Sequence, residues 1–186
     1  MSKVARLVSK YQSHIGIPWA AGLAAVQRVI FAVYDKTDEL RMRAHIDAFE
    51  LATHETGHEW LLLDVTNAFP EWMAQQEYRE SYFECPDDLA GYHLGELDGF
   101  YEALITKLRT EIDAKVSSNM VVAIMGVGSL FGLCRASTIV EGLKDHIPGR
   151  LLVFFPGEFI AESYSYRLLD ARDGWNYQAV PLTTNE

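Results

Sequence analysis

Four short apolar runs divide the chain and predict its architecture. They are residues 29–34, 60–65, 120–125 and 151–155, with the sequences VIFAVY, WLLLDV, MVVAIM and LLVFF. Each run is apolar throughout instead of alternating with polar residues, which is typical of parallel strands that are covered on both faces. The pattern therefore predicts a parallel sheet buried between two layers of helices.

Amphipathic patterns fill the intervals between these runs and predict helices. After the first run, Met42, Ile46 and Phe49 recur at helical spacing, and Gly57 suits the position that follows a helix end. Further helices are expected over residues 69–78, from about 87 to about 115, and over 129–146. Strands that alternate with helices indicate right-handed βαβ units.

The pattern changes near the carboxyl terminus, where residues 166–171 and 177–182 flank Asp173 and Gly174. An Asp-Gly pair between aromatic and β-branched runs predicts a hairpin turn. We therefore expect one extra antiparallel pair, or an edge strand beside the parallel sheet. The whole chain, 1–186, is predicted to be a single α/β domain with a mainly parallel sheet and flanking helices, Rossmann-like or degenerate P-loop-like, plus a C-terminal β-hairpin.

Composition and charge narrow the possible functions. Of the 186 residues 49% are hydrophobic and 23% are charged, as in an ordinary globular protein, and the formal net charge is −10. A surface this acidic repels nucleic acid and anionic lipid, so direct binding to either is not expected. No apolar run reaches ~18 residues, so no membrane span is predicted. Only two cysteines, far apart, argue against a secreted disulfide scaffold, and we expect a cytoplasmic protein.

His54, Glu55 and His58 match the H-E-x-x-H pattern of zinc peptidases. In those enzymes the two histidines lie one helical turn apart and bind the metal, while the glutamate polarises the bound water. Here a strand is predicted to begin at Trp60, so the helix ends before both histidines can share a face. We therefore predict no metal site and interpret these residues as polar groups at a helix end. A zinc-dependent peptidase, with Glu55 as the base, is the alternative.

A glycine-rich turn over residues 126–132 (GVGSLFG) follows the third apolar run and is expected to open a helix. Phosphate binds at such places in many α/β proteins. The turn has neither the G-x-G-x-x-G spacing nor the lysine of G-x-x-x-x-G-K-[ST], so a tight turn is the favoured interpretation. A nucleotide-binding or degenerate P-loop-like domain is the alternative, although no cofactor is predicted. Its candidate anion-binding residues, which would share the carboxyl rim of the sheet, are Gly126, Gly128, Ser129, Asp35 and Asp64.

No arrangement of side chains predicts catalysis, but aromatic residues cluster in two segments. Tyr, Trp and Arg are the usual anchors of protein interfaces, and the same side chains can also fill a core. The candidate interface residues are Trp72, Tyr78, Arg79, Tyr82, Phe83, Tyr164 and Trp175.

Several longer strings resemble one known family. They are residues 17–19 (IPW), 29–39 (VIFAVYDKTDE), 77–84 (EYRESYFE), 126–132 (GVGSLFG), 150–158 (RLLVFFPGE) and 166–182 (YRLLDARDGWNYQAVPL). Together they cover most of the chain and resemble the small B component of the bacteriophage-exclusion (BREX) defence systems. Residues 54–58 lie outside these strings, which counts further against the zinc interpretation.

The resemblance implies a non-catalytic accessory protein of a multi-gene phage-defence island. Such islands also encode an adenine-specific DNA methyltransferase, a large ATPase and a PglZ-type protein with an alkaline-phosphatase-like domain. The resemblance brings no set of catalytic residues with it. It implies an adaptor that acts through protein–protein interaction with other BREX proteins, and the PglZ-type component is the expected partner.

Overall fold

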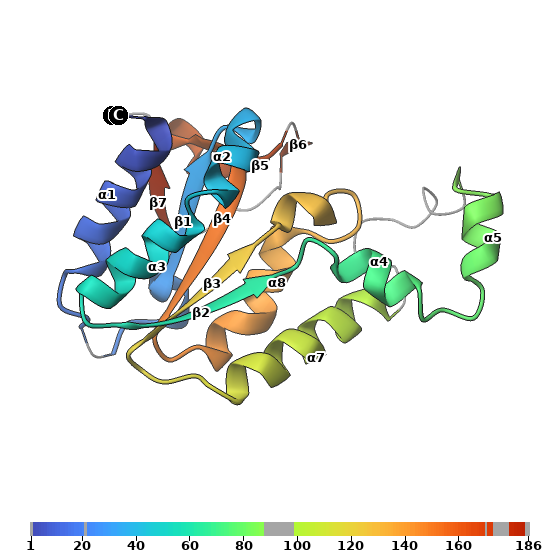
Figure 1. The fold of residues 1–186 in the computed structure, drawn as a ribbon, viewed down its shortest axis with the longest axis horizontal. Coiled ribbons are helices and arrows are strands. Elements are labelled where there is room, and N and C mark those ends of the chain that lie inside the picture. Colours follow the sequence, from blue (N-terminus) through green and yellow to red (C-terminus); the bar gives the residue numbers. More distant parts are fainter. Residues whose placement is uncertain (1, 21, 88–98, 170, 173–178, 185–186) are drawn as a thin grey trace.

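The computed structural model describes residues 2–20, 22–87, 99–169, 171–172 and 179–184. Five parallel strands form the centre of its sheet, in the order β2-β3-β4-β1-β7 (Figure 1). They are β1 (Val29–Tyr34), β2 (Glu59–Asp64), β3 (Met120–Met125), β4 (Arg150–Ile160) and β7 (Val180–Thr183). The four apolar runs are all strands, which confirms the predicted parallel α/β fold.

The strand order tests the Rossmann-like variant of the predicted fold. Numbered among the parallel strands alone, the order is 2-3-4-1-5. Dinucleotide-binding folds have the order 3-2-1-4-5-6 and flavodoxin-like folds 2-1-3-4-5. The observed order matches neither, so the parallel sheet is confirmed and the Rossmann-like strand order is not.

Helices cover both faces of the sheet because alternate residues of each strand point to opposite sides. One face packs against α1 (Lys3–Ile15), α2 (Glu39–Arg43) and α3 (Ile46–Glu55). The other packs against α4 (Ala68–Met73), α7 (Phe100–Asp113) and α8 (Ala136–Leu143). Outside these layers lie α5 (Arg79–Glu84) and the short 3-10 turns η1 (Ala25–Arg28), η2 (Lys36–Asp38), η3 (Val127–Leu130), η4 (Lys144–His146) and η5 (Ala161–Ser163).

The helices are shorter than the sequence pattern predicted. The predicted helix over 129–146 is wrong in its first part, because η3 ends at Leu130 and α8 begins only at Ala136. Gly132, with φ of 81°, and the extended Phe131 stop the helical path between them. Of the long helix predicted from about 87 to 115, α7 is the described part, and residues 88–98 lie outside the described ranges.

The carboxyl-terminal segment forms both an antiparallel pair and an edge strand. Strand β5 (Ser165–Leu168) pairs antiparallel with the end of β4 and with β6 (Ala171–Arg172). The predicted pairing of 166–171 with 177–182 is wrong, because β7 pairs parallel with β1 instead. Leu182 of β7 packs into the core beneath α1, which ties this strand to the main sheet. The Asp173-Gly174 turn lies outside the described residues.

Candidate functional site

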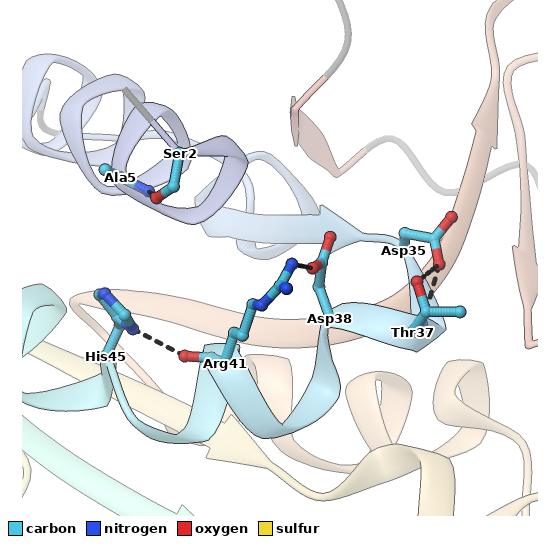
Figure 2. Close-up of polar contacts among 7 residues, drawn as sticks. All are labelled: Ser2, Ala5, Asp35, Thr37, Asp38, Arg41 and His45. Carbon is cyan, nitrogen blue, oxygen red and sulfur yellow. Dashed lines mark hydrogen bonds and ion pairs between the residues drawn. The ribbon is translucent and has the colours of Figure 1, made fainter.

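The carboxyl ends of the parallel strands form a rim where open α/β proteins bind ligands. Asp35 follows β1 and accepts hydrogen bonds from the Thr37 amide (2.8 Å) and the Thr37 hydroxyl (2.6 Å) (Figure 2). These two bonds lower the pKa of the exposed Asp35 carboxyl below its ordinary value. The residue is thus the cap of η2, and the next acid, Asp38, accepts a bond from Arg41 at 2.9 Å (Figure 2).

The ends of β2 and β3 meet at the same rim. The Thr66 amide donates to Asp64 Oδ1 at 2.9 Å, and the Thr66 hydroxyl donates to the same oxygen. Gly126 follows β3 with φ of 89°, and a Cβ there would lie 2.7 Å from the Thr66 nitrogen. Only glycine allows this approach of two backbones. The structure therefore brings Asp64 and Gly126 together, as the sequence predicted, through Thr66.

A chain of hydrogen bonds through α2 crosses this rim and links β1 to β2, although β4 and β3 lie between these two strands. The Tyr34 hydroxyl donates to Glu39 Oε2 at 2.6 Å. Arg43 donates to Glu39 Oε1 at 2.7 Å and to the Thr66 hydroxyl at 2.9 Å. Burial, followed by the bond to Glu39, raises the pKa of Tyr34 far above its ordinary value. Sequence reasoning missed these residues, although the spacing of Glu39 and Arg43 fits an (i, i+4) ion pair.

The glycine turn itself packs inward. Val127 and Leu130 are buried in η3, whereas Ser129 is exposed. A Cβ on Gly128 would lie 3.2 Å from the Pro156 side chain. The glycine turn opens only the single 3-10 turn η3, and the α-helix α8 begins six residues later, so the α-helix expected at the glycines is absent there.

Of the five candidate anion-binding residues, Asp35 lies on the far side of β4 and β3 from Asp64. A hollow of about 430 Å³ lies beside Asp35, at the carboxyl ends of β1, β4 and β7. Its charged lining residues are Lys3, Asp35 and Glu158. Two carboxylates and one lysine do not give the positive field that attracts a phosphate.

The H-E-x-x-H residues lie at the opposite, amino end of the sheet. Helix α3 ends at Glu55, Gly57 has φ of 84°, and β2 begins at Glu59. His58 is therefore outside the helix, as expected from the apolar run that begins at Trp60. Both histidines cannot share a helix face in this arrangement.

Each of the three side chains has a separate partner. Glu55 accepts from Gln12 at 2.8 Å, and His54 Nε2 lies 3.6 Å from Glu50. His58 Nδ1 lies 2.6 Å from Asn119 Oδ1. The Asn119 amide donates to the Gly57 carbonyl, so its oxygen accepts and His58 Nδ1 must carry the proton. In the described parts of the chain, no group of three or more His, Cys, Asp or Glu side chains is placed to hold a metal.

The His58 ring also belongs to a stack of planar groups. It lies on the Trp19 ring, with centroids 3.9 Å apart and planes inclined by 11°. The Arg150 guanidinium lies over the same indole, 4.5 Å from its centroid. Trp19 is therefore the common contact of the His58 ring and the Arg150 guanidinium. The stack joins the segment after α1 to the starts of β2 and β4.

The candidate interface residues differ in exposure. Tyr78 and Phe83, at the two ends of α5, are 70% and 66% exposed, and Arg79 is exposed between them. Trp72 is half-buried against the core, 5.4 Å from the Phe100 ring. The others are the half-buried Tyr82, the exposed Tyr164, and Trp175, which lies outside the described residues.

The fold and its two ends define a parallel α/β protein with helices on both faces of the sheet. In the comparison with family models, the model described as BREX protein BrxB matches residues 63–182, well over half of the chain. The chain therefore belongs to this family and is a component of a BREX phage-defence system. No curated protein and no solved structure matches it.

Proposed function

We propose that this chain is a non-catalytic adaptor of its BREX system, which acts in the cytoplasm and binds the PglZ-type component. The observation that carries the proposal is the α5 segment. This six-residue helix has no buried residue, although helices this short are unstable without tertiary contacts. Tyr78 and Phe83 present large apolar surfaces beside the Arg79 guanidinium, which is the composition of interface hot spots. A partner would bury the exposed side chains of α5 and so add tertiary contacts to this helix.

The hydrogen bonds at the carboxyl rim also agree with an adaptor. At the carboxyl rim, carboxylates that could serve a ligand already accept hydrogen bonds from the chain's own Thr37, Thr66, Tyr34 and Arg43. No helix in the described ranges is both long and apolar enough to cross a bilayer.

Co-purification of the full chain with the PglZ-type protein of the same gene island tests the proposal. The double variant Tyr78→Ser, Phe83→Ser should weaken the complex by more than about tenfold, because hot-spot residues contribute about 2 kcal/mol or more each. Leu40→Ser is the matched control, since Leu40 is 82% exposed on α2, away from this segment. Failure of the chain to bind the PglZ-type protein or any other product of the island would contradict the adaptor function.

A further inference from the structure

The two outer edges of the sheet, β2 and β7, are built differently. In the described part of the chain, each of these strands pairs with one neighbour and leaves its other side open. An open edge presents unpaired N–H and C=O groups that can pair with another chain, and proteins usually protect such edges.

The β7 edge is protected. The strand has only four residues, and Pro181 in its middle has no N–H to offer. The Lys10 ammonium of α1 donates to the Thr183 carbonyl at 3.0 Å and places a charge beside the strand. Short length, proline and lysine are the usual devices that prevent strand addition.

The β2 edge has none of these devices. The Glu59 amide donates to the Asn119 carbonyl at 3.0 Å, and the Val65 amide donates to the Met125 carbonyl at 2.9 Å. Odd-numbered residues therefore face β3, and the backbone groups of Trp60, Leu62 and Asp64 point outward. No backbone bond from these three residues to another described segment occurs. The strand is six residues long, and its four central residues are all apolar.

The charges at the two ends of β2 indicate which kind of chain can pair with its open edge. Glu59 begins the strand, Asp64 ends it, and both are exposed. A second copy paired antiparallel would bring Glu59 of one chain near Asp64 of the other at both ends, and each chain carries a net charge of −10. Like charges across a strand pair are destabilising. A segment with basic residues at its two ends would instead place opposite charges there.

We propose that β2 accepts an extended segment of a partner protein as an added strand, and that this segment is apolar in its centre with lysine or arginine at both ends. Backbone hydrogen bonds would provide the binding and the flanking charges the selectivity, as in other cases of strand addition. The inference rests on the proposed adaptor function, because it states how the partner is recognised.

Two synthetic peptides test the chemistry of the edge, KVTVTVK and its counterpart EVTVTVE. NMR measures the hydrogen-exchange rates of the backbone amides of the full chain in the presence of either peptide at millimolar concentration. Slower exchange at the outward amides of β2 reports the pairing. The lysine peptide should slow exchange at Trp60, Leu62 and Asp64, whereas Leu61 and Leu63, already bonded to β3, should change little. It should bind roughly fivefold or more tighter than the glutamate peptide, because each exposed charge pair contributes about two- to fivefold.

Variants separate the edge from the fold. Leu62→Pro removes one outward N–H and should abolish peptide binding, while Leu62→Val keeps it and should bind normally. Glu59→Lys changes an exposed side chain and leaves the strand backbone unchanged. It should reverse the preference between the two peptides at that end of β2. This variant tests the proposal even if Leu62→Pro fails to fold. Equal binding of both peptides, or no protection of the outward amides, would overturn the proposal. The proposal would also be overturned if the chain forms a dimer in sedimentation and the amides protected in that dimer are those of β2.

The complex with the PglZ-type protein distinguishes failure of this proposal from failure of the adaptor function. A complex that forms and is indifferent to Glu59→Lys and Leu62→Pro would leave the adaptor in place and refute the β2 edge as its docking site. If a peptide protects the amides of β2 but no complex with the PglZ-type protein or another product of the island forms, the β2 edge is supported as a docking site and the adaptor function is contradicted.

Discussion

The two ends of the sheet are held by different kinds of contact. At the carboxyl end, a chain of directional hydrogen bonds through Tyr34, Glu39 and Arg43 reaches Thr66 across β4 and β3. At the amino end, the His58 ring stacks on the Trp19 ring and the Arg150 guanidinium lies over the same indole. A hydrogen-bonded group that loses its partner is left with an unsatisfied polar atom, whereas a stack loses only contact area. Substitutions should therefore be costlier at the carboxyl end.

The largest effect is expected at Gly126. In Gly126→Ala, the new Cβ would meet the Thr66 backbone at 2.7 Å, and alanine would be held at a φ of 89°. Left-handed strain and overpacking each cost about 1–2 kcal/mol, so unfolding by denaturant should show a loss of about 3 kcal/mol. Gly132→Ala is the control, because Gly132 has φ of 81° and nothing within 4 Å of its Cβ position. Equal losses in the two variants would mean that the contact with Thr66 is unimportant.

Arg43 should have the next largest effect at this end. Arg43→Met keeps most of the side-chain volume but removes the bonds to Glu39 and Thr66, with an expected loss of about 1–2 kcal/mol. Lys107→Met, on α7, removes an ion pair to Glu71 in which the two side chains are 55% and 56% exposed, and it should cost less than about 0.5 kcal/mol. Denaturation curves of the two variants measure the difference directly. Similar curves would show that α2 does not tie the strand ends together.

A smaller effect is expected at the amino end, where the two histidines of the H-E-x-x-H string should behave unequally. His58→Ala removes the stack on Trp19 and the bond to Asn119 and should cost about 1 kcal/mol. His54→Ala removes an exposed side chain and should cost less than about 0.5 kcal/mol. A zinc site would make the two histidines equivalent. One zinc per chain by elemental analysis, lost equally in both variants, would therefore contradict the structure.

The sequence predicted the strands well because each one is a continuous apolar run with polar or glycine-rich flanks. The bounds of β1 and β3 agree with the predicted runs. The strand order could not be predicted, because it depends on pairings between segments far apart in the chain. The predicted pairing of the carboxyl-terminal hairpin was wrong for the same reason. Leu182 packs against apolar residues under α1, and its strand lies on the far side of β1 from β4 and β5.

The rim was predicted in part. The rule that parallel strands end at one edge correctly placed Asp64 beside Gly126. The polar chain through Tyr34, Glu39 and Arg43 has no sequence motif, since it is assembled from a strand end, a helix and a neighbouring loop. Only the (i, i+4) spacing within α2 offered a local signal.

The smallest effect is expected from pH, and it also belongs to the amino end. His14 lies half-buried in the last turn of α1. Burial, and then the nearby Arg150 guanidinium, lower its pKa below the ordinary value of 6.5. The native state therefore binds fewer protons than the unfolded state once the pH falls below that value. Stability is fully present above it and is lost as the pH falls through the lowered native pKa.

His14→Gln isolates this contribution, because glutamine keeps a polar side chain that does not titrate. Denaturation measured between pH 7.5 and about pH 5 should show a flatter loss of stability in the variant than in the parent chain. Arg150→Gln should reduce the loss as well, since it removes the second cause of the shift, although it also removes one layer of the Trp19 stack. Parallel curves for parent and His14→Gln would mean that this histidine is equally accessible to protons in the native and unfolded states. The contacts of the Trp19 stack would then stabilise the amino end without any contribution of His14 to the pH dependence of stability.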